Sequence, residues 1–269
     1  MNVMARLHAI RKLIFRRDPY IMIAIKPPEM LRSLPATYCY DSVRQRLDTY
    51  RERFYGTLSA LMPVMQALHH RMIEAPQGAK LPLENNYFGG LDALAAHAMV
   101  VTRRPRRIVE VGSGYSTMFL RQAIEDEGLD TEIVCIDPRP RTDITSFADR
   151  IHYKSVLDVD LALFSDLGRN DFLFIDGSHY VFSGTDVSHV FLNILPQINS
   201  GVIVHFHDIM LPYEYIGPFR DRYYNEQYML ATLLLFSDLW EPLLPVYYLR
   251  QNQDILDGYE GASFWMRRT

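Results

Sequence analysis

Apolar residues follow two different rhythms along the chain. Between Asp41 and Ile73 they recur at three- and four-residue spacing with charged residues between them, which is typical of an amphipathic helix. After residue 106 the pattern changes to short apolar runs, each followed by a helical stretch. The change predicts an N-terminal helical extension over residues 1–80 and an α/β domain over residues 81–269.

Five short apolar runs are typical of buried parallel strands, because strands covered on both faces are apolar almost throughout. They are RIVEVGSG (107–114), EIVCID (132–137), a weaker run near 151–156, DFLFIDG (171–177) and GVIVHFHD (201–208). Helices are expected over 91–101, 118–127, 184–195 and 225–236, and antiparallel edge strands at VYYL (246–249) and ASFWMRR (262–268). The predicted fold is a doubly wound, Rossmann-like α/β fold with a mostly parallel sheet and a C-terminal antiparallel edge.

Composition narrows the class of protein mainly by exclusion. A net charge of -4 and a pI near 6.1 argue against a dedicated nucleic-acid binder, which usually has a basic domain. Two distant cysteines, Cys39 and Cys135, exclude a disulfide scaffold and fit a cytoplasmic setting. No stretch approaches the ~20 apolar residues of a membrane span, so no transmembrane segment is expected.

The N-terminus carries apolar residues at helical spacing, Val3, Leu7, Ile10 and Ile14, beside five basic residues. Such a basic amphipathic helix can lie on a membrane surface, but more often it packs on its own domain or on a second subunit. The N-terminal helices are therefore where a homo-oligomer contact is expected.

Residues that can do chemistry stand at the exit of every predicted strand, where ligands bind in open α/β sheets. In chain order they are Glu110, Gly112, Gly114 and Ser116, then Asp137, Asp158, Asp176 and His179, and finally His207 and Asp208. Glycine lets the backbone turn tightly and approach a ligand, and Asp137 is placed to accept hydrogen bonds from ribose hydroxyls. A dinucleotide fingerprint would have a third glycine where Thr117 stands, which weakens a nicotinamide-cofactor interpretation.

The histidines of VIVHFHDIMLP (202–212) differ in their position along the predicted strand. His205 and His207 share a face because strand side chains alternate, but His205 lies deeper and is expected to be structural. His207 and Asp208 fall at the strand exit. His179 and His207 are both candidate general bases. The alternatives are histidines that fix loop geometry by hydrogen bonding, and an Asp208 that caps the following turn.

Two sets of motifs resemble known methyltransferases. EVGSGYST (110–117) and CIDP (135–138) resemble motifs one and two of the class I S-adenosylmethionine-dependent methyltransferases. FIDGSHY (174–180), GVIVHFHDIMLPYEY (201–215), NEQYML (225–230) and GASFWMRR (261–268) resemble small bacterial members related to sugar and natural-product O-methyltransferases. The resemblance covers roughly residues 84–268.

The resemblance implies S-adenosyl-L-methionine as cofactor and gives the strand-exit residues their roles. The expected cofactor-binding residues are Glu110, Gly112, Gly114 and Ser116 at the methionine part, Asp137 at the ribose, Asp158 near the adenine, and Asp176 at the reaction centre. The expected catalytic residues are His179, His207 and Asp208.

The resemblance is compatible with a site that binds a divalent metal ion and with one that does not. Some relatives bind Mg²⁺ through an aspartate after the fourth strand and an acidic pair after the fifth; Asp176 and Asp208 match, but His207 replaces a carboxylate. Because Mg²⁺ prefers oxygen ligands, a metal-free site is favoured here. A softer divalent ion would accept the imidazole, and its expected ligands are Asp176, His207 and Asp208.

The sequence thus predicts an S-adenosylmethionine-dependent methyltransferase that acts on an oxygen of a small sugar-like or natural-product acceptor. Tyrosines after the fifth strand suit such an acceptor, although core packing explains aromatic residues as often. The alternatives are a nicotinamide-dependent oxidoreductase and a non-catalytic, cofactor-binding interaction module.

Overall fold

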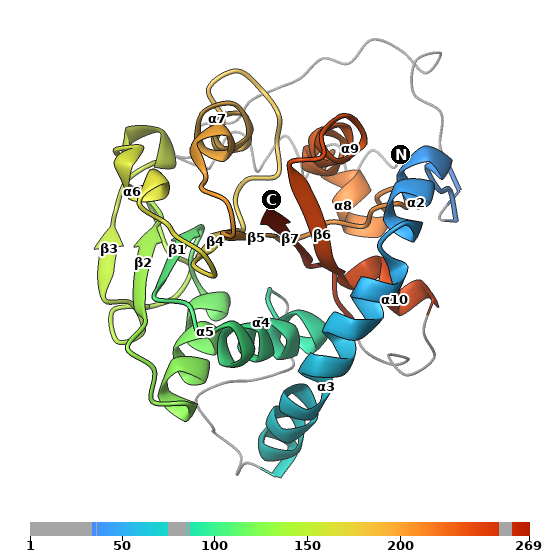
Figure 1. Cartoon of the computed structure of the whole chain (residues 1–269). Helices are drawn as coiled ribbons and strands as arrows, with labels where there is room; N and C mark the ends of the chain where they lie inside the picture. The colour runs from blue at the N-terminus through green and yellow to red at the C-terminus, as the bar shows by residue number, and fades with distance from the viewer. Residues whose placement is uncertain (1–33, 36, 75–84, 86, 253–259) are drawn as a thin grey trace, which may run out of the picture. The chain divides into compact units, whose positions relative to one another are not determined.

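The structure is a computed structural model, and it describes residues 34–35, 37–74, 85, 87–252 and 260–269 (Figure 1). Ala36–Thr269 form one compact unit, and the fold and the site described below lie within it. The amphipathic helix expected near the N-terminus lies outside the described residues.

A seven-stranded sheet forms the centre of this unit, in the order β3-β2-β1-β4-β5-β7-β6. Its strands are β1 (Arg107–Val111), β2 (Glu132–Ile136), β3 (Arg150–His152), β4 (Phe172–Ile175), β5 (Ile203–Phe206), β6 (Trp240–Pro245) and β7 (Phe264–Arg268). Strands β1 to β5 pair in parallel, and β7 runs antiparallel to both β5 and β6. The predicted doubly wound, mostly parallel sheet with an antiparallel C-terminal part is confirmed.

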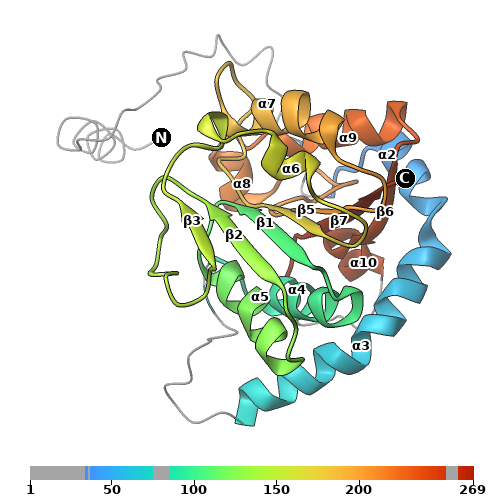
Figure 2. The same cartoon turned by 60° about the vertical axis from the view of Figure 1, so that its left-hand side comes forward.

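Helices cover both faces of the sheet, with α4 and α5 on one side and α7 and α9 on the other (Figures 1 and 2). The helices are α2 (Asp41–Asp48), α3 (Arg51–Glu74), α4 (Gly90–Arg103), α5 (Tyr115–Asp126), α6 (Ala162–Ser165), α7 (Asp186–His189), α8 (Gly217–Asp221), α9 (Glu226–Phe236) and α10 (Val246–Asn252). Two short 3₁₀-helices, η1 (Val156–Asp158) and η3 (Leu195–Gln197), and a short π-helix, η2 (Val190–Ile194), complete the helical elements of the described residues. In the described part of the chain, none of the helices has the length and apolar character that crossing a membrane requires.

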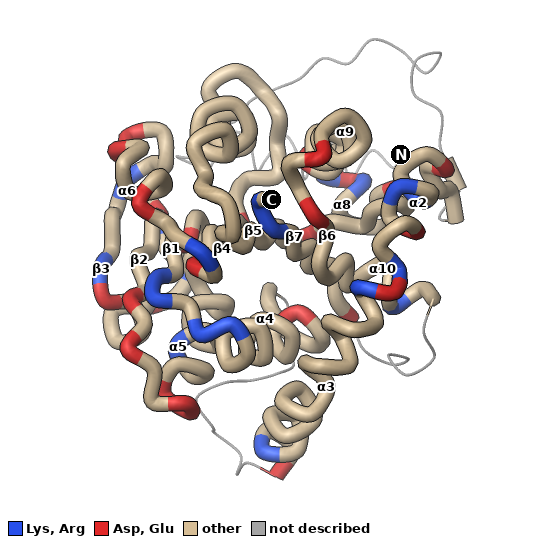
Figure 3. The backbone as a smooth tube through the Cα atoms, viewed as in Figure 1, with Lys and Arg blue, Asp and Glu red and all other residues tan. Residues whose placement is uncertain are grey.

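The central strands are apolar because both of their faces are covered. All residues of β4 and β5 are buried, and Figure 3 shows no charged residue on either strand. Val109, Phe174 and Val204, on three neighbouring strands, are all fully buried in the core. This burial fixes the sheet register and leaves the polar chemistry at the strand ends.

The C-terminal strand prediction was wrong in two respects. VYYL (246–249) lies in α10, and the strand is the preceding segment, β6. Pro242 and Pro245 conceal this strand in the sequence, but an edge strand tolerates proline, and β6 has a register shift between Pro242 and Leu244. The second strand, β7, is antiparallel as expected, yet it lies between β5 and β6 and is not an edge.

Helices α2 and α3 confirm the helical pattern between Asp41 and Ile73, and both pack on the sheet domain. The Arg46 Nε atom donates to the Leu234 carbonyl of α9 at 3.1 Å, and Arg53 forms an ion pair with Glu241 of β6. These helices therefore belong to the same compact unit as the sheet. A domain division at residue 80 stays a prediction.

Candidate cofactor cavity and histidine–aspartate cluster

A cavity of about 480 Å³ lies beyond the carboxyl ends of β1, β2 and β4. This is the point where the strand order reverses, because β2 and β4 flank β1 on opposite sides. Its volume is in the range of pockets that bind cofactors and small molecules. Its walls come from the turn after β1, the end of β2, η1 and the loop between β4 and α7; they include Gly112–Ser116, Asp137–Arg139, Ser155–Leu157, Asp176–Ser178 and Gly184–Asp186.

The turn after β1 uses its two glycines differently. Gly112 has a φ of +79°, and a β-carbon there would lie 1.9 Å from the carbonyl oxygen of Asp176. Gly112 therefore lets the first turn pack directly on the end of β4. A β-carbon on Gly114 would meet nothing within 4 Å, and Gly114 lines the cavity. Its missing side chain leaves space for a ligand.

Glu110 lies behind this turn, where it is fully buried and does not line the cavity. Its carboxylate accepts hydrogen bonds from Ser116 Oγ at 2.7 Å and Thr117 Oγ1 at 2.5 Å. Burial raises the pKa of Glu110 to about 7, and the hydroxyl hydrogen bonds only partly oppose this. The structure thus places Glu110 as a support for the start of α5. Thr117, where a dinucleotide fingerprint would have glycine, is part of that support.

Asp137 and Asp158, both expected at the cofactor, lie in different surroundings. Asp137 lines the cavity, and its carboxylate accepts from the backbone N–H groups of Ser113 at 2.8 Å and Arg139 at 2.7 Å. It therefore joins the glycine turn to the end of β2. Asp158 is exposed at the end of η1, and the cavity wall is formed by the preceding residues, Ser155–Leu157.

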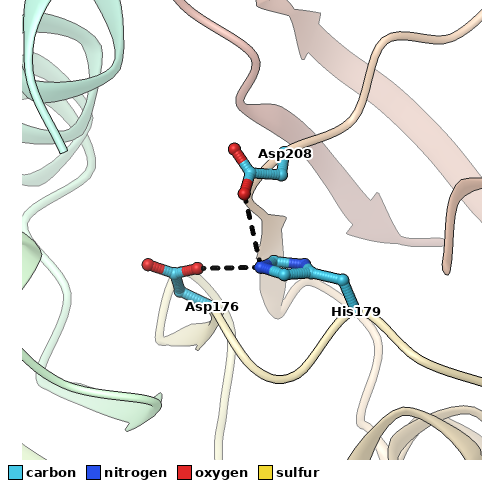
Figure 4. Close-up of side chains that lie close together, drawn as sticks. All are labelled: Asp176, His179 and Asp208. Atoms are coloured by element: carbon cyan, nitrogen blue, oxygen red, sulfur yellow. Dashed lines mark ion pairs between the residues drawn. The ribbon is translucent and has the colours of Figure 1, made fainter. Parts of the chain in front are cut away.

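Four polar side chains converge beside the cavity, at the ends of β4 and β5. The Nε2 atom of His179 lies 3.5 Å from Asp176 Oδ1 and 3.4 Å from Asp208 Oδ2 (Figure 4). The Nδ1 atom of His207 lies 3.5 Å from Asp176 Oδ1 and 3.4 Å from Asp208 Oδ1. We call these four residues the His–Asp cluster. Asp176 belongs to the cluster and also lines the cavity, so the two features meet there.

Two cluster residues have a left-handed backbone that side chains other than glycine rarely adopt. The φ angle is +65° at His179 and +55° at Asp208. Such conformations cost of order 1–3 kcal/mol each and concentrate at functional sites. Figure 4 shows the carboxylates of Asp176 and Asp208 both directed at the same ring nitrogen of His179.

Each imidazole is held from behind by a buried carboxylate that the sequence analysis did not identify. His179 Nδ1 lies 2.9 Å from Glu226 Oε2, at the start of α9. His207 Nε2 lies 3.2 Å from Asp92 Oδ2, in the first turn of α4. Asp92 also accepts from the backbone N–H groups of Ala262 and Ser263. The sequence did offer one sign of these two residues: each is the single acidic residue of an otherwise mostly apolar helix, α4 or α9.

The cluster charges shift one another's protonation. Burial lowers the pKa of His179 and of His207, but the neighbouring carboxylates outweigh it and raise both well above the ordinary value. Burial opposes ionisation of Asp176 as well, yet the two imidazoles hold its pKa below the ordinary range. Burial raises the pKa of Asp208, and the imidazoles offset this only in part.

His205 lies within β5, two residues before His207, and has different contacts. Its ring stacks on Phe174 with centroids 3.7 Å apart, and its Nε2 atom lies 2.9 Å from Ser263 Oγ. Burial lowers its pKa well below the ordinary value. The neutral ring packs within the core, as expected of a structural histidine.

A family model for a methyltransferase domain matches residues 109–209, from β1 to just beyond β5. The matched segment contains the glycine turn, Asp137 and the His–Asp cluster. This similarity supports the methyltransferase part of the sequence-based prediction over the nicotinamide-dependent alternative.

Other similarities to the chain are partial or distant. An uncharacterised protein of Archaeoglobus fulgidus is 37% identical over 92 residues, which are 32% of this chain and 42% of that protein. The matched segment thus spans less than half of this relative. The SAH-bound methyltransferase PaMTH1 of Podospora anserina is 15% identical, with 88% and 99% of the two chains covered and a TM-score of 0.46. An O-methyltransferase from Bacillus cereus in complex with SAH is 16% identical, with 79% and 91% covered and a TM-score of 0.41.

Proposed function

We propose that the chain transfers the methyl group of S-adenosyl-L-methionine to an oxygen of a small sugar-like or natural-product acceptor in the cytoplasm. The observation that carries this proposal is the contact between the cavity and the His–Asp cluster at Asp176. A cofactor in the cavity would have its reactive end beside groups that can act on an acceptor hydroxyl.

The glycine turn and Asp137 supply the cofactor side of the proposed reaction. Gly114 leaves room for close approach, and Asp137 presents a carboxylate to ribose hydroxyls while it holds the turn through Ser113. The bound cofactor supplies an electrophilic methyl group. Because methyl transfer is an in-line displacement, these residues contribute mainly by alignment.

The His–Asp cluster supplies the acceptor side. A hydroxyl must lose its proton as it attacks, and positioned groups of this kind contribute typically 10²–10⁴-fold to such steps. The ring of Tyr224 lies 4.4 Å from that of His179, and Tyr180 lies next to Tyr224. Aromatic faces beside the cluster suit a sugar or a planar acceptor.

Replacing Asp137 with alanine is expected to weaken binding of S-adenosylmethionine by about 10- to 100-fold, the effect of losing hydrogen bonds to a charged group. Calorimetric titration with S-adenosylmethionine or S-adenosylhomocysteine measures this. Asp158→Ala is the matched control, and its affinity should stay unchanged because that carboxylate lies outside the cavity wall. Equal losses in the two variants, or no binding by the wild type at millimolar ligand, would contradict the cofactor assignment.

Replacing Asp208 with asparagine is expected to lower kcat by at least about 100-fold while leaving the cofactor Kd unchanged. The reason is that Asp208 belongs to the cluster but does not line the cavity. The measurement is S-adenosylhomocysteine release with a panel of hydroxyl acceptors. An Asp208→Asn enzyme with wild-type turnover on every accepted substrate would refute the role of the cluster.

A further inference from the structure

The ion pairs within the His–Asp cluster are longer than charge-assisted hydrogen bonds. The four separations between ring nitrogens and carboxylate oxygens are 3.5, 3.4, 3.5 and 3.4 Å. Charge-assisted N–H···O hydrogen bonds are shorter, at about 2.7–2.9 Å. Ligand atoms held about 2.0–2.2 Å from one central ion in tetrahedral geometry lie about 3.3–3.6 Å apart. The separations from His179 Nε2 to Asp176 and Asp208 match the spacing of ligand atoms around one ion.

The carboxylates of Glu226 and Asp92 orient both imidazoles so that each presents one nitrogen to an ion. A carboxylate accepts hydrogen bonds, so Glu226 places the proton of His179 on Nδ1, and Asp92 places that of His207 on Nε2. Once an ion displaces the second proton, the free nitrogen of each ring points into the cluster. Both histidines are more than nine-tenths buried, at 3% and 6% exposure, so water reaches these nitrogens poorly. A carboxylate behind a histidine is the usual outer partner of a metal-bound imidazole.

We propose that the His–Asp cluster binds a divalent transition-metal ion of the zinc type. Asp176, His179 and Asp208 form the inner set, since one ligand atom from each lies within 4.8 Å of the others. His207 adds a second nitrogen within 3.5 Å of both carboxylates. The structure adds His179 to the ligands expected from the sequence, and the proposal replaces the metal-free site favoured there.

The donor set selects against magnesium. Mg²⁺ takes oxygen ligands and keeps several waters, whereas imidazole suits zinc and its neighbours in the first transition row. An ion at this position would also lower the pKa of an acceptor hydroxyl next to the cavity. The site lies at the acceptor end of the proposed methyltransferase, but metal binding does not depend on methyl transfer, so each can be tested without the other.

The test is calorimetric titration of chelator-treated full-length protein with ZnCl₂ and with MgCl₂. We expect one Zn²⁺ per chain, with a Kd lower than that of Mg²⁺ by on the order of 100-fold or more. CoCl₂ serves as a spectroscopic probe, because a Co²⁺ ion with nitrogen ligands should give visible absorption bands that excess Zn²⁺ removes. Equal affinities for Mg²⁺ and Zn²⁺, or no Zn²⁺ binding, would overturn the proposal.

Substitutions in and around the cluster test whether the ion binds there. His179→Ala should abolish the Co²⁺ bands, and Glu226→Gln, which keeps all four ligands, should weaken Zn²⁺ binding by about 10- to 100-fold. Glu214→Gln is the matched control: this buried glutamate bonds Tyr40 and Tyr228, and its loss should leave the Zn²⁺ affinity unchanged. Circular dichroism confirms that each variant is folded, and Glu226→Gln keeps the test valid if His179→Ala does not fold.

Two outcomes separate this proposal from the proposed function. Wild-type Zn²⁺ affinity in folded Glu226→Gln, or retained Co²⁺ bands in folded His179→Ala, would refute the metal site even if S-adenosylmethionine still binds. Zn²⁺ binding that these variants weaken, in a protein that does not bind S-adenosylmethionine, would support the metal site and refute the methyltransferase proposal.

Discussion

Gly112→Ala is expected to destabilise the protein by more than about 4 kcal/mol, an unusually large effect for one methyl group. The added β-carbon would lie 1.9 Å from the Asp176 carbonyl oxygen, so the turn after β1 and the end of β4 would have to separate. The φ of +79° adds strain, because residues with a β-carbon rarely adopt it. Urea unfolding followed by circular dichroism measures the loss.

Gly114→Ala is the matched control, two residues along the same turn. Its β-carbon would meet no protein atom within 4 Å, so the unfolding midpoint should stay close to that of the wild type. The methyl group would instead stand in the cavity, and the affinity for S-adenosylmethionine should fall. Similar stabilities for the two variants would show that the turn after β1 does not pack on the end of β4 as closely as described.

Glu110→Gln is expected to change how stability depends on pH. The pKa of buried Glu110 is raised to about 7, so the folded state keeps a proton that the unfolded chain releases near pH 4.5. Binding of this proton stabilises the folded state. The stabilisation is complete below pH 4.5 and is lost as the pH rises to 7, at 1.36 kcal/mol per pH unit. Roughly 3 kcal/mol is therefore lost across this range in the wild type and kept in Glu110→Gln.

Urea unfolding of both proteins at pH 5 and pH 8 measures this effect. The difference in unfolding free energy between Glu110→Gln and the wild type should move by roughly 2–3 kcal/mol in favour of the variant between the two pH values. Exposed Glu125→Gln on α5 is the control and should show no such change. A pH-independent difference for Glu110→Gln would mean that Glu110 ionises normally in the folded protein.

Much of the fold could be predicted because parallel strands covered on both faces consist almost entirely of apolar residues. FLFI is apolar throughout, IVHF is apolar apart from His205, and both are central strands. The error at VYYL has the opposite cause. An edge strand is constrained on one side alone, so β6 could contain Pro242 and Pro245, and its sequence no longer indicated a strand.

The candidate site divides in the same way. Asp137, Asp176, His179 and Asp208 were predictable because parallel strands bring their exits to one edge of the sheet. Asp92 and Glu226 were not, because their partners lie far away in sequence: 115 residues separate Asp92 from His207, and 47 separate Glu226 from His179. Only the packing of α4 and α9 on the sheet brings these pairs together.

The two carboxylates behind the imidazoles come from opposite helical layers, with Asp92 on α4 and Glu226 on α9. A one-residue insertion near the start of either helix would rotate its carboxylate by about 100° around the helix axis, away from the ring. The rotational setting of each helix about its own axis is therefore tied to the imidazole that its carboxylate contacts. Insertions and deletions tolerated elsewhere on these helices should be excluded from their first turns.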